Sequence, residues 1–99
     1  MATHIEHDLL HDIKIKYPKK FKVLILNDDY TSMEFVIDIL MNVFHKTYPQ
    51  AEAIMLDVHK KEKGICGVYT REIAQTKVVT VHKKAKDSGF PLKCIMEEE

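Results

Sequence analysis

A short apolar segment that ends at three hydrogen-bond acceptors is the feature that most limits how this chain can fold. Residues 21–26 are mostly apolar and include β-branched side chains, which predicts a strand. The strand ends at Asn27, Asp28 and Asp29, and apolar residues at helical spacing begin soon afterwards. A buried strand and an amphipathic helix must therefore be joined by a short polar connection.

The rest of the chain alternates between the same two kinds of pattern. Thr31 and Glu34 have the spacing of a capping box, which predicts the start of the first helix. Thr47 and Pro49 predict a second helix start, and Gly64 is expected to end that helix. In chain order, the predicted elements are a strand at 21–26, a helix at about 31–44, a helix from 47 to the break at Gly64, a strand at 65–69, a helix at about 70–87 and a strand at 92–96.

This order predicts an α+β fold in which a small sheet packs against three helices, all on one face of the sheet. The strand pairing does not follow from the sequence, and we expect it to be antiparallel. We expect residues 1–17 to be a flexible N-terminal extension, because Pro18 and a lysine-rich segment separate them from the rest. Residues 18–99 are predicted to form a single domain.

The composition narrows the classes of function. Apolar residues make up 45% of the chain and charged residues 30%, as in a globular domain. The 15 basic and 15 acidic residues cancel, which argues against nucleic-acid binding. No apolar stretch has the length of a membrane span. The N-terminus lacks the pattern of an export signal, so we expect a cytoplasmic protein in which Cys66 and Cys94 are reduced core thiols.

The acceptor cluster of Asn27, Asp28 and Asp29 allows two interpretations. Ionised carboxylates only accept hydrogen bonds, and an asparagine carbonyl adds a further acceptor, so the cluster suits a metal ion, a lysine or arginine, or a free amine. Asn and Asp are also typical of turns, where their side chains bond to the neighbouring backbone. The three residues alone do not decide between a cation site and a turn.

Apolar residues on the first two predicted helices indicate a pocket beside this cluster. Met33 and Val36 lie one helical turn apart, and Met55 and Val58 share a face of the second helix, next to His59. If the two helices pack as a hairpin, these residues can form an adaptable apolar pocket with a polar rim. The same spacing is also typical of ordinary core.

Three stretches together resemble the ClpS family of bacterial adaptors, which deliver N-degron substrates to the Clp unfoldase–protease. They are VLILNDDYTSMEFVIDIL, AIMLDVHKKEKGICGVYTREIAQTK and PLKC, and the resemblance covers about residues 18–96. It implies a binding module that is not an enzyme, needs no cofactor and folds like the C-terminal domain of a ribosomal stalk protein. It also implies binding to proteins whose first residue is Leu, Phe, Tyr or Trp, without ranking them.

The resemblance assigns roles to individual residues. It implies that Asn27, Asp29 and His59 hold the free α-amino group of the substrate, with Asp28 nearby. Met33 would guard the pocket for the first side chain and reject β-branched residues. The implied lining of that pocket is Leu26, Thr31, Met33, Val36, Met55, Val58 and Leu92.

The resemblance extends to a second surface. Glu72 and Lys77 match positions that contact the N-terminal domain of a ClpA-type AAA+ unfoldase, and residues 1–17 match an extension that the unfoldase engages. The chain departs from the family pattern at Ser32, where Pro is usual, and at Glu62, where Gly is frequent. Glu62 is expected to alter the turn after the second helix.

Other chemistry has weaker support in the sequence. His4, His7 and His11 could share a helix face and bind zinc or nickel, although a histidine-containing tail has the same pattern. The acceptor cluster and His59 could form a metal site or an acid–base pair, but no nucleophile elbow or phosphate-binding Gly loop accompanies them. The alternative function is a stalk-type interaction domain that does not recognise an N-terminal amine. We expect a monomer.

Overall fold

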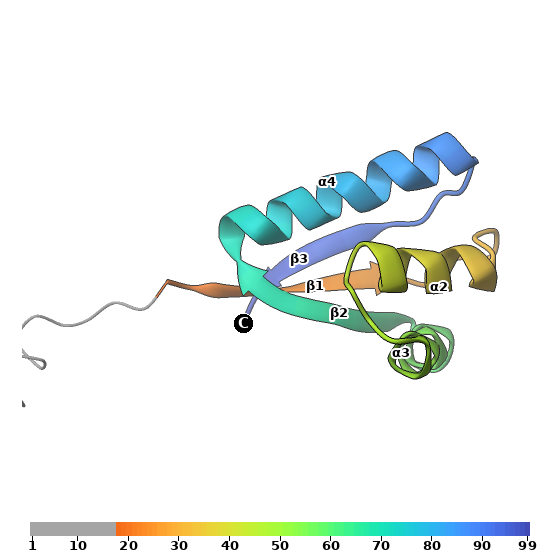
Figure 1. The fold of residues 1–99 in the computed structure, drawn as a ribbon, viewed down its shortest axis with the longest axis horizontal. Helices are drawn as coiled ribbons and strands as arrows, with labels where there is room; N and C mark the ends of the chain where they lie inside the picture. Colours follow the sequence, from red (N-terminus) through yellow and green to blue (C-terminus); the bar gives the residue numbers. More distant parts are fainter. Residues whose placement is uncertain (1–17) are drawn as a thin grey trace, which may run out of the picture.

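The computed structural model describes residues 18–99. The predicted extension over residues 1–17, with His4, His7 and His11, lies outside the described residues. Figure 1 shows β1 between the other two strands, with the helices beside them. The order of elements confirms the prediction: β1 (Lys20–Leu26), α2 (Met33–Asn42), α3 (Tyr48–Lys61), β2 (Lys63–Thr70), α4 (Arg71–Ser88) and β3 (Cys94–Glu98).

The sheet is antiparallel, as expected. Its strand order is β2-β1-β3, so β1 is the central strand and pairs with both neighbours. Ile25 of β1 lies opposite Gly64 of β2 and Cys94 of β3. The register of the β1–β2 pair shifts between Val23 and Leu24. Such an irregularity adds local twist to the pair of strands.

One hydrophobic core joins the sheet to the helices. Val23 and Ile25 of β1 are fully buried in it, together with Ile39 and Leu40 of α2. Helix α4 contacts all three strands, α3 contacts β2, and α2 contacts α3. The predicted arrangement, with the helices on one face of a small sheet, is therefore confirmed.

The two cysteines are core residues, as predicted. Cys66 and Cys94 are free thiols and both are buried. Burial raises the pKa of Cys94 to about 12. Burial, and then the neighbouring Cys94, raise the pKa of Cys66 far above its ordinary value. Both thiols stay protonated at neutral pH and behave as small apolar side chains.

The start of α2 differs from the prediction. Ser32, and not Thr31, is the N-cap, and its hydroxyl oxygen accepts the Phe35 N–H at 3.1 Å. Thr31 instead donates its hydroxyl to Asp28 Oδ2 at 2.7 Å. The predicted capping box was therefore wrong, because the Asp28 carboxylate binds the Thr31 hydroxyl. Glu34 still lies in the first turn, where its charge complements the helix dipole.

Helix α3 begins as predicted and ends earlier. The Thr47 hydroxyl accepts the Gln50 N–H at 3.3 Å, and the Gln50 side chain accepts the Thr47 N–H at 3.0 Å, which forms a complete capping box. The helix ends at Lys61, and Glu62 follows in the left-handed region with φ 71°. The break predicted at Gly64 was therefore placed too late.

Gly64 has a different role: it lets α3 lie against β2. A Cβ atom at this position would be 2.7 Å from Val58 Cγ2 and 3.0 Å from the Ile54 carbonyl oxygen. Any side chain here would push the two elements apart. The close approach fixes the C-terminal half of α3, which carries His59, against the sheet.

The last two elements follow the prediction with small shifts. Helix α4 ends at Ser88, and Gly89 caps it in the left-handed region with φ 78°. Strand β3 begins at Cys94, two positions after the predicted start at Leu92. Among the helices described between residues 18 and 99, none is long and apolar enough to cross a membrane.

Candidate functional site

Asp28 organises the connection between β1 and α2. Its Oδ1 accepts the backbone N–H groups of Tyr30 at 2.8 Å and Thr31 at 2.7 Å, and its Oδ2 accepts the Thr31 hydroxyl at 2.7 Å. Burial alone would raise the pKa of Asp28, but these hydrogen bonds together lower it below its ordinary value. The turn interpretation therefore holds for Asp28. Asp29 takes no part in these bonds and is exposed.

Asn27 joins this connection to the end of α3. Its backbone N–H donates to the Glu62 carbonyl at 2.9 Å, and its side-chain Nδ2 donates to Glu62 Oε2 at 3.3 Å. Glu62 comes three residues after His59 in the chain. The acceptors that follow β1 and the histidine of α3 are thus brought to the same end of the sheet.

A third segment meets the other two at this end. The Leu26 N–H donates to the Lys93 carbonyl at 3.0 Å, which places Leu92 beside the end of β1. The rings of Phe35 and Phe90 pack at 4.9 Å between centroids, so the turn that precedes Leu92 is held against α2. No local pattern in the sequence indicates this aromatic pair, because its partners are distant in the chain.

The residues predicted to line the apolar pocket differ in burial. Val36 and Val58 are 6% and 5% exposed and belong to the core, as the ordinary-core interpretation expected. Leu92, at 4% exposed, belongs to the same core. Met33 is 61% exposed. Leu26, Thr31 and Met55 are half-buried. Three of the predicted lining residues are therefore core side chains, and Met33 is the exposed member of the set.

A cavity of about 440 Å³ lies next to the acceptor cluster. It brings together Asn27, Asp28 and Asp29 with the half-buried Leu26. His59 and the predicted lining residues of α2 and α3 do not border it. Between residues 18 and 99, no three His, Cys, Asp or Glu side chains are grouped so that they could hold a metal ion. The acceptors that border the cavity are the exposed Asn27 and Asp29 and the half-buried Asp28.

Comparison with known proteins identifies the family to which this chain belongs. The family model described as ATP-dependent Clp protease adaptor protein ClpS matches residues 16–95. The chain belongs to the ClpS family. It is therefore an adaptor of the Clp protease and not itself an enzyme.

Curated ClpS proteins resemble the chain over nearly their whole length. The ClpS of Oleidesulfovibrio alaskensis is 51% identical, with 99% of this chain and 94% of that protein covered. The ClpS of Neisseria meningitidis is 55% identical, with 98% of this chain and 94% of that protein covered. A solved structure of Agrobacterium tumefaciens ClpS2 bound to L-phenylalaninamide matches with a TM-score of 0.81 and 37% identity, covering 84% of this chain and 100% of that one.

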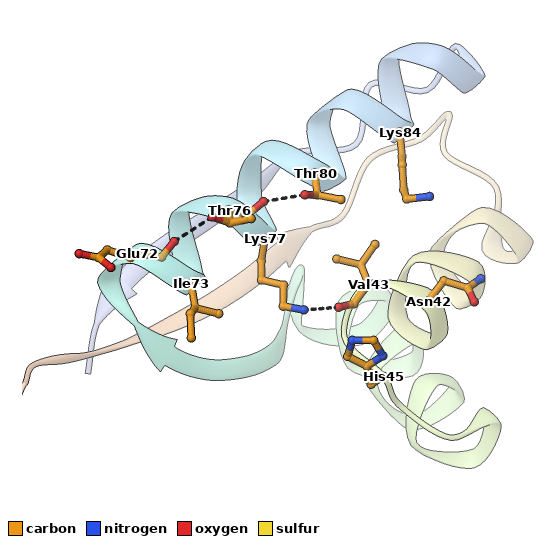
Figure 2. A pocket seen from close by; sticks show the side chains of 9 residues that line it. All are labelled: Asn42, Val43, His45, Glu72, Ile73, Thr76, Lys77, Thr80 and Lys84. Carbon is orange, nitrogen blue, oxygen red and sulfur yellow. Dashed lines mark hydrogen bonds between the residues drawn. The ribbon is translucent and has the colours of Figure 1, made fainter.

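This ClpS-family protein has a second hollow surface, between α4 and the end of α2. The cavity there measures about 400 Å³ and contains both residues predicted to contact an unfoldase, Glu72 and Lys77 (Figure 2). The complete lining is Asn42, Val43, His45, Glu72, Ile73, Thr76, Lys77, Thr80 and Lys84. The lining residues on α4 follow helical spacing, so the sequence could have predicted that they share a face. The sequence could not have predicted that the end of α2 lies opposite them.

Lys77 is bound within the chain at this surface. Figure 2 shows it reaching from α4 toward the end of α2, where its Nζ donates to the Val43 carbonyl at 2.6 Å. The same Nζ lies 6.0 Å from the centre of the Phe44 ring and 5.6 Å from that of Tyr69. Lys77 is half-buried, whereas Glu72 is exposed. Only Glu72 thus fits the expectation of an exposed helix charge.

Proposed function

We propose that this adaptor binds proteins whose first residue is Leu, Phe, Tyr or Trp and delivers them to a ClpA-type AAA+ unfoldase in the cytoplasm. The observation that carries the proposal is the link between Asn27 and Glu62, which gathers the acceptors after β1 at the end of α3 that carries His59. The ligand of the Agrobacterium ClpS2, L-phenylalaninamide, supports it, because that molecule combines a free α-amino group with an aromatic side chain.

The proposed amine site follows from donor and acceptor chemistry. An α-ammonium group has only donors, so each of its partners must accept. Asn27 offers a carbonyl oxygen, Asp29 a carboxylate, and His59 a ring nitrogen when the imidazole is neutral. An internal peptide has an uncharged amide with a single donor in that place, and it would leave acceptors unpaired. The site would therefore select free N-termini over internal sequence.

The apolar part of the site cannot account for binding alone. Burying one Leu or Phe side chain contributes roughly 1.5–3 kcal/mol, whereas micromolar affinity requires about 8 kcal/mol. We therefore assign much of the difference to charge-assisted hydrogen bonds with the ammonium group. In this proposal Val36, Val58 and Leu92 form the floor of the pocket, and the exposed Met33 closes over the first side chain.

The delivery step is assigned to the cavity between α4 and the end of α2. Glu72 offers an exposed carboxylate there, and Ile73, which is 49% exposed, offers an apolar contact. The Lys77 ammonium already binds the Val43 carbonyl and lies near the Phe44 and Tyr69 rings. We therefore propose that Lys77 contributes to the unfoldase contact through the shape and charge of this surface. We propose that the protein makes this contact as a monomer.

Fluorescence anisotropy with two labelled peptides tests the proposal. One peptide begins with Leu-Leu and the other is the same sequence with an acetylated N-terminus. We expect micromolar or tighter binding of the free amine, and its loss on acetylation. Equal binding of both peptides would refute amine recognition and favour a stalk-type interaction domain. Binding of neither peptide would also refute the proposed substrate.

A further inference from the structure

Glu62 has a backbone conformation that is unusual for its residue type. It follows the last residue of α3 with φ 71°, in the left-handed region that favours glycine. In the part of the chain that the structure describes, His45 is the only other non-glycine residue with positive φ. A side chain in this region carries a steric cost, which contacts with the surrounding structure must offset.

The side chain of Glu62 has a specific partner. Its Oε2 accepts a hydrogen bond from Asn27 Nδ2 at 3.3 Å. The other bond between the two residues, from the Asn27 N–H to the Glu62 carbonyl at 2.9 Å, involves backbone atoms alone. Glycine at position 62 could keep the backbone bond, whereas only a longer side chain with an acceptor can hold Nδ2.

The orientation of the Asn27 amide decides what it offers to a ligand. One end of this group is a donor and the other is an acceptor. When Nδ2 is bound to Glu62, Oδ1 is the end that remains available. An α-ammonium needs the acceptor and would be repelled by a rotated amide that presents its NH₂ group. Fixing Nδ2 therefore fixes the polarity of the site.

We propose that Glu62 is a positioning residue for substrate recognition, which holds the Asn27 amide with its carbonyl oxygen available to the α-amino group of the substrate. This inference rests on the proposed binding of N-terminal amines. Glu62 acts through Asn27, and its own charge is secondary. This role predicts that removing the side chain weakens peptide binding and raises the stability of the fold.

Three variants separate the effects of the Asn27 contact, the charge of Glu62 and the backbone strain at Glu62. Glu62→Gly removes the acceptor and relieves the left-handed strain. Glu62→Gln keeps an acceptor for Asn27 Nδ2 but removes the charge. Glu52→Gln is the matched control, because it removes an exposed carboxylate from α3, the helix that Glu62 follows, and Glu52 makes no contact with Asn27. Each variant is titrated with the free-amine and acetylated Leu-Leu peptides, and its urea midpoint is measured.

We expect Glu62→Gly to bind the free-amine peptide about threefold to fivefold more weakly, the range of an exposed charged contact, and to have a higher urea midpoint. Glu62→Gln should stay within about twofold of the parent chain, and Glu52→Gln should match it. Unchanged affinity in Glu62→Gly would overturn the proposal. So would an equal loss in Glu62→Gln, which would make charge the cause, or a lower urea midpoint in Glu62→Gly, which would make the role structural.

The result also separates this inference from the proposed function. If the parent chain binds both peptides alike, amine recognition itself fails, and the role of Glu62 fails with it. If the parent chain discriminates between them and Glu62→Gly does so equally well, only the role of Glu62 fails. The side-chain amide signals of Asn27 in NMR spectra give a readout without any ligand. We expect them to shift in Glu62→Gly and to remain close to the parent position in Glu62→Gln.

Discussion

Hydrogen-bond acceptors at the two ends of α2 differ in whether the chain itself supplies their partner. Just after its C-terminal end, the Val43 carbonyl binds the Lys77 ammonium at 2.6 Å, so the cation comes from the same chain. Before its N-terminal end, Asn27 and Asp29 are exposed on a loop. There, we propose, the cation is the α-ammonium of a substrate.

The difference shows how one kind of interaction can serve folding at one place and binding at another. At the Val43 end, the cation joins α4 to α2 and stabilises the fold directly. At the Asn27 end, we propose that acceptors remain available to a ligand. Other hydrogen bonds within the chain hold the loop that carries these acceptors. Those contacts are the hydrogen bonds of Asp28 within the loop and of Asn27 with Glu62. In this proposal, Asp28 and Glu62 hold in place the residues of the loop that bind the ligand.

The largest effect is expected from removing an acceptor at the binding end. Asp29→Ala should abolish detectable binding of the free-amine Leu-Leu peptide, because a hydrogen bond to a charged group contributes about 1.5–3 kcal/mol and the ammonium group would be left with an unpaired donor. Folding should be unaffected, since Asp29 is exposed and lies outside the loop's own hydrogen bonds. Anisotropy and circular dichroism measure the two properties.

Asp38→Ala on α2 is the control for Asp29→Ala, because it removes the same charge from an exposed position on the helix. It should leave peptide affinity unchanged. An Asp29→Ala protein that binds as tightly as the parent would show that the cluster is only a turn. One that is unfolded would show that Asp29 belongs to the folding contacts and not to the site.

An intermediate effect is expected at the other end of α2. Lys77→Met should destabilise the fold by about 1 kcal/mol, because it leaves the Val43 carbonyl without its donor and removes the cation from the Phe44 and Tyr69 rings. Urea unfolding measures the loss, and anisotropy should show unchanged affinity for the free-amine peptide.

Lys84→Met removes a lysine from the same cavity without removing the donor to Val43, so it should have little effect on stability. If Lys77→Met were as stable as Lys84→Met, the internal cation would contribute nothing to folding. The contrast between the two ends of α2 would then fail. A loss of peptide affinity in Lys77→Met would equally contradict it, because the two ends would not be independent.

Local signals in the sequence were enough to predict most of the fold. The apolar and β-branched residues at 21–26 located β1, and the helical spacing of apolar residues located the helices. Thr47, the predicted cap of the second helix, forms a capping box with Gln50 in the structure. The prediction of Thr31 as the cap was wrong because a neighbouring residue could take the same role. Both Thr31 and Ser32 can cap a helix, and the Asp28 carboxylate, by binding the Thr31 hydroxyl, leaves Ser32 as the cap.

The sequence proposed residues for the candidate site, but it did not indicate how they are connected. The acceptor cluster, Met33 and His59 were recognisable from their types, spacing and family resemblance. The bond from Asn27 to Glu62 joins residues 35 positions apart, and that from Lys77 to Val43 joins residues 34 positions apart. No local pattern encodes such pairs, because they depend on how α3 and α4 pack on the sheet. Glu62, a departure from the family pattern, was expected to alter a turn, and its contact with Asn27 was missed.

The smallest effect is expected from Asp28, and it depends on pH. The folded-state pKa of Asp28 is lowered, so its ionised form contributes stability above the unfolded-state value of about 4, and this contribution is lost as the pH falls through the lower folded-state pKa. Asp28→Asn should therefore cost a few tenths of a kcal/mol at pH 7, because the half-buried carboxylate lies near the surface and solvent screens its charge. The difference from the parent chain should shrink below about pH 4. Urea unfolding of both proteins at the two pH values measures it. A difference that grew on acidification would mean that Asp28 is better bound when protonated, and the loop that prepares the binding end would have to be held by other groups.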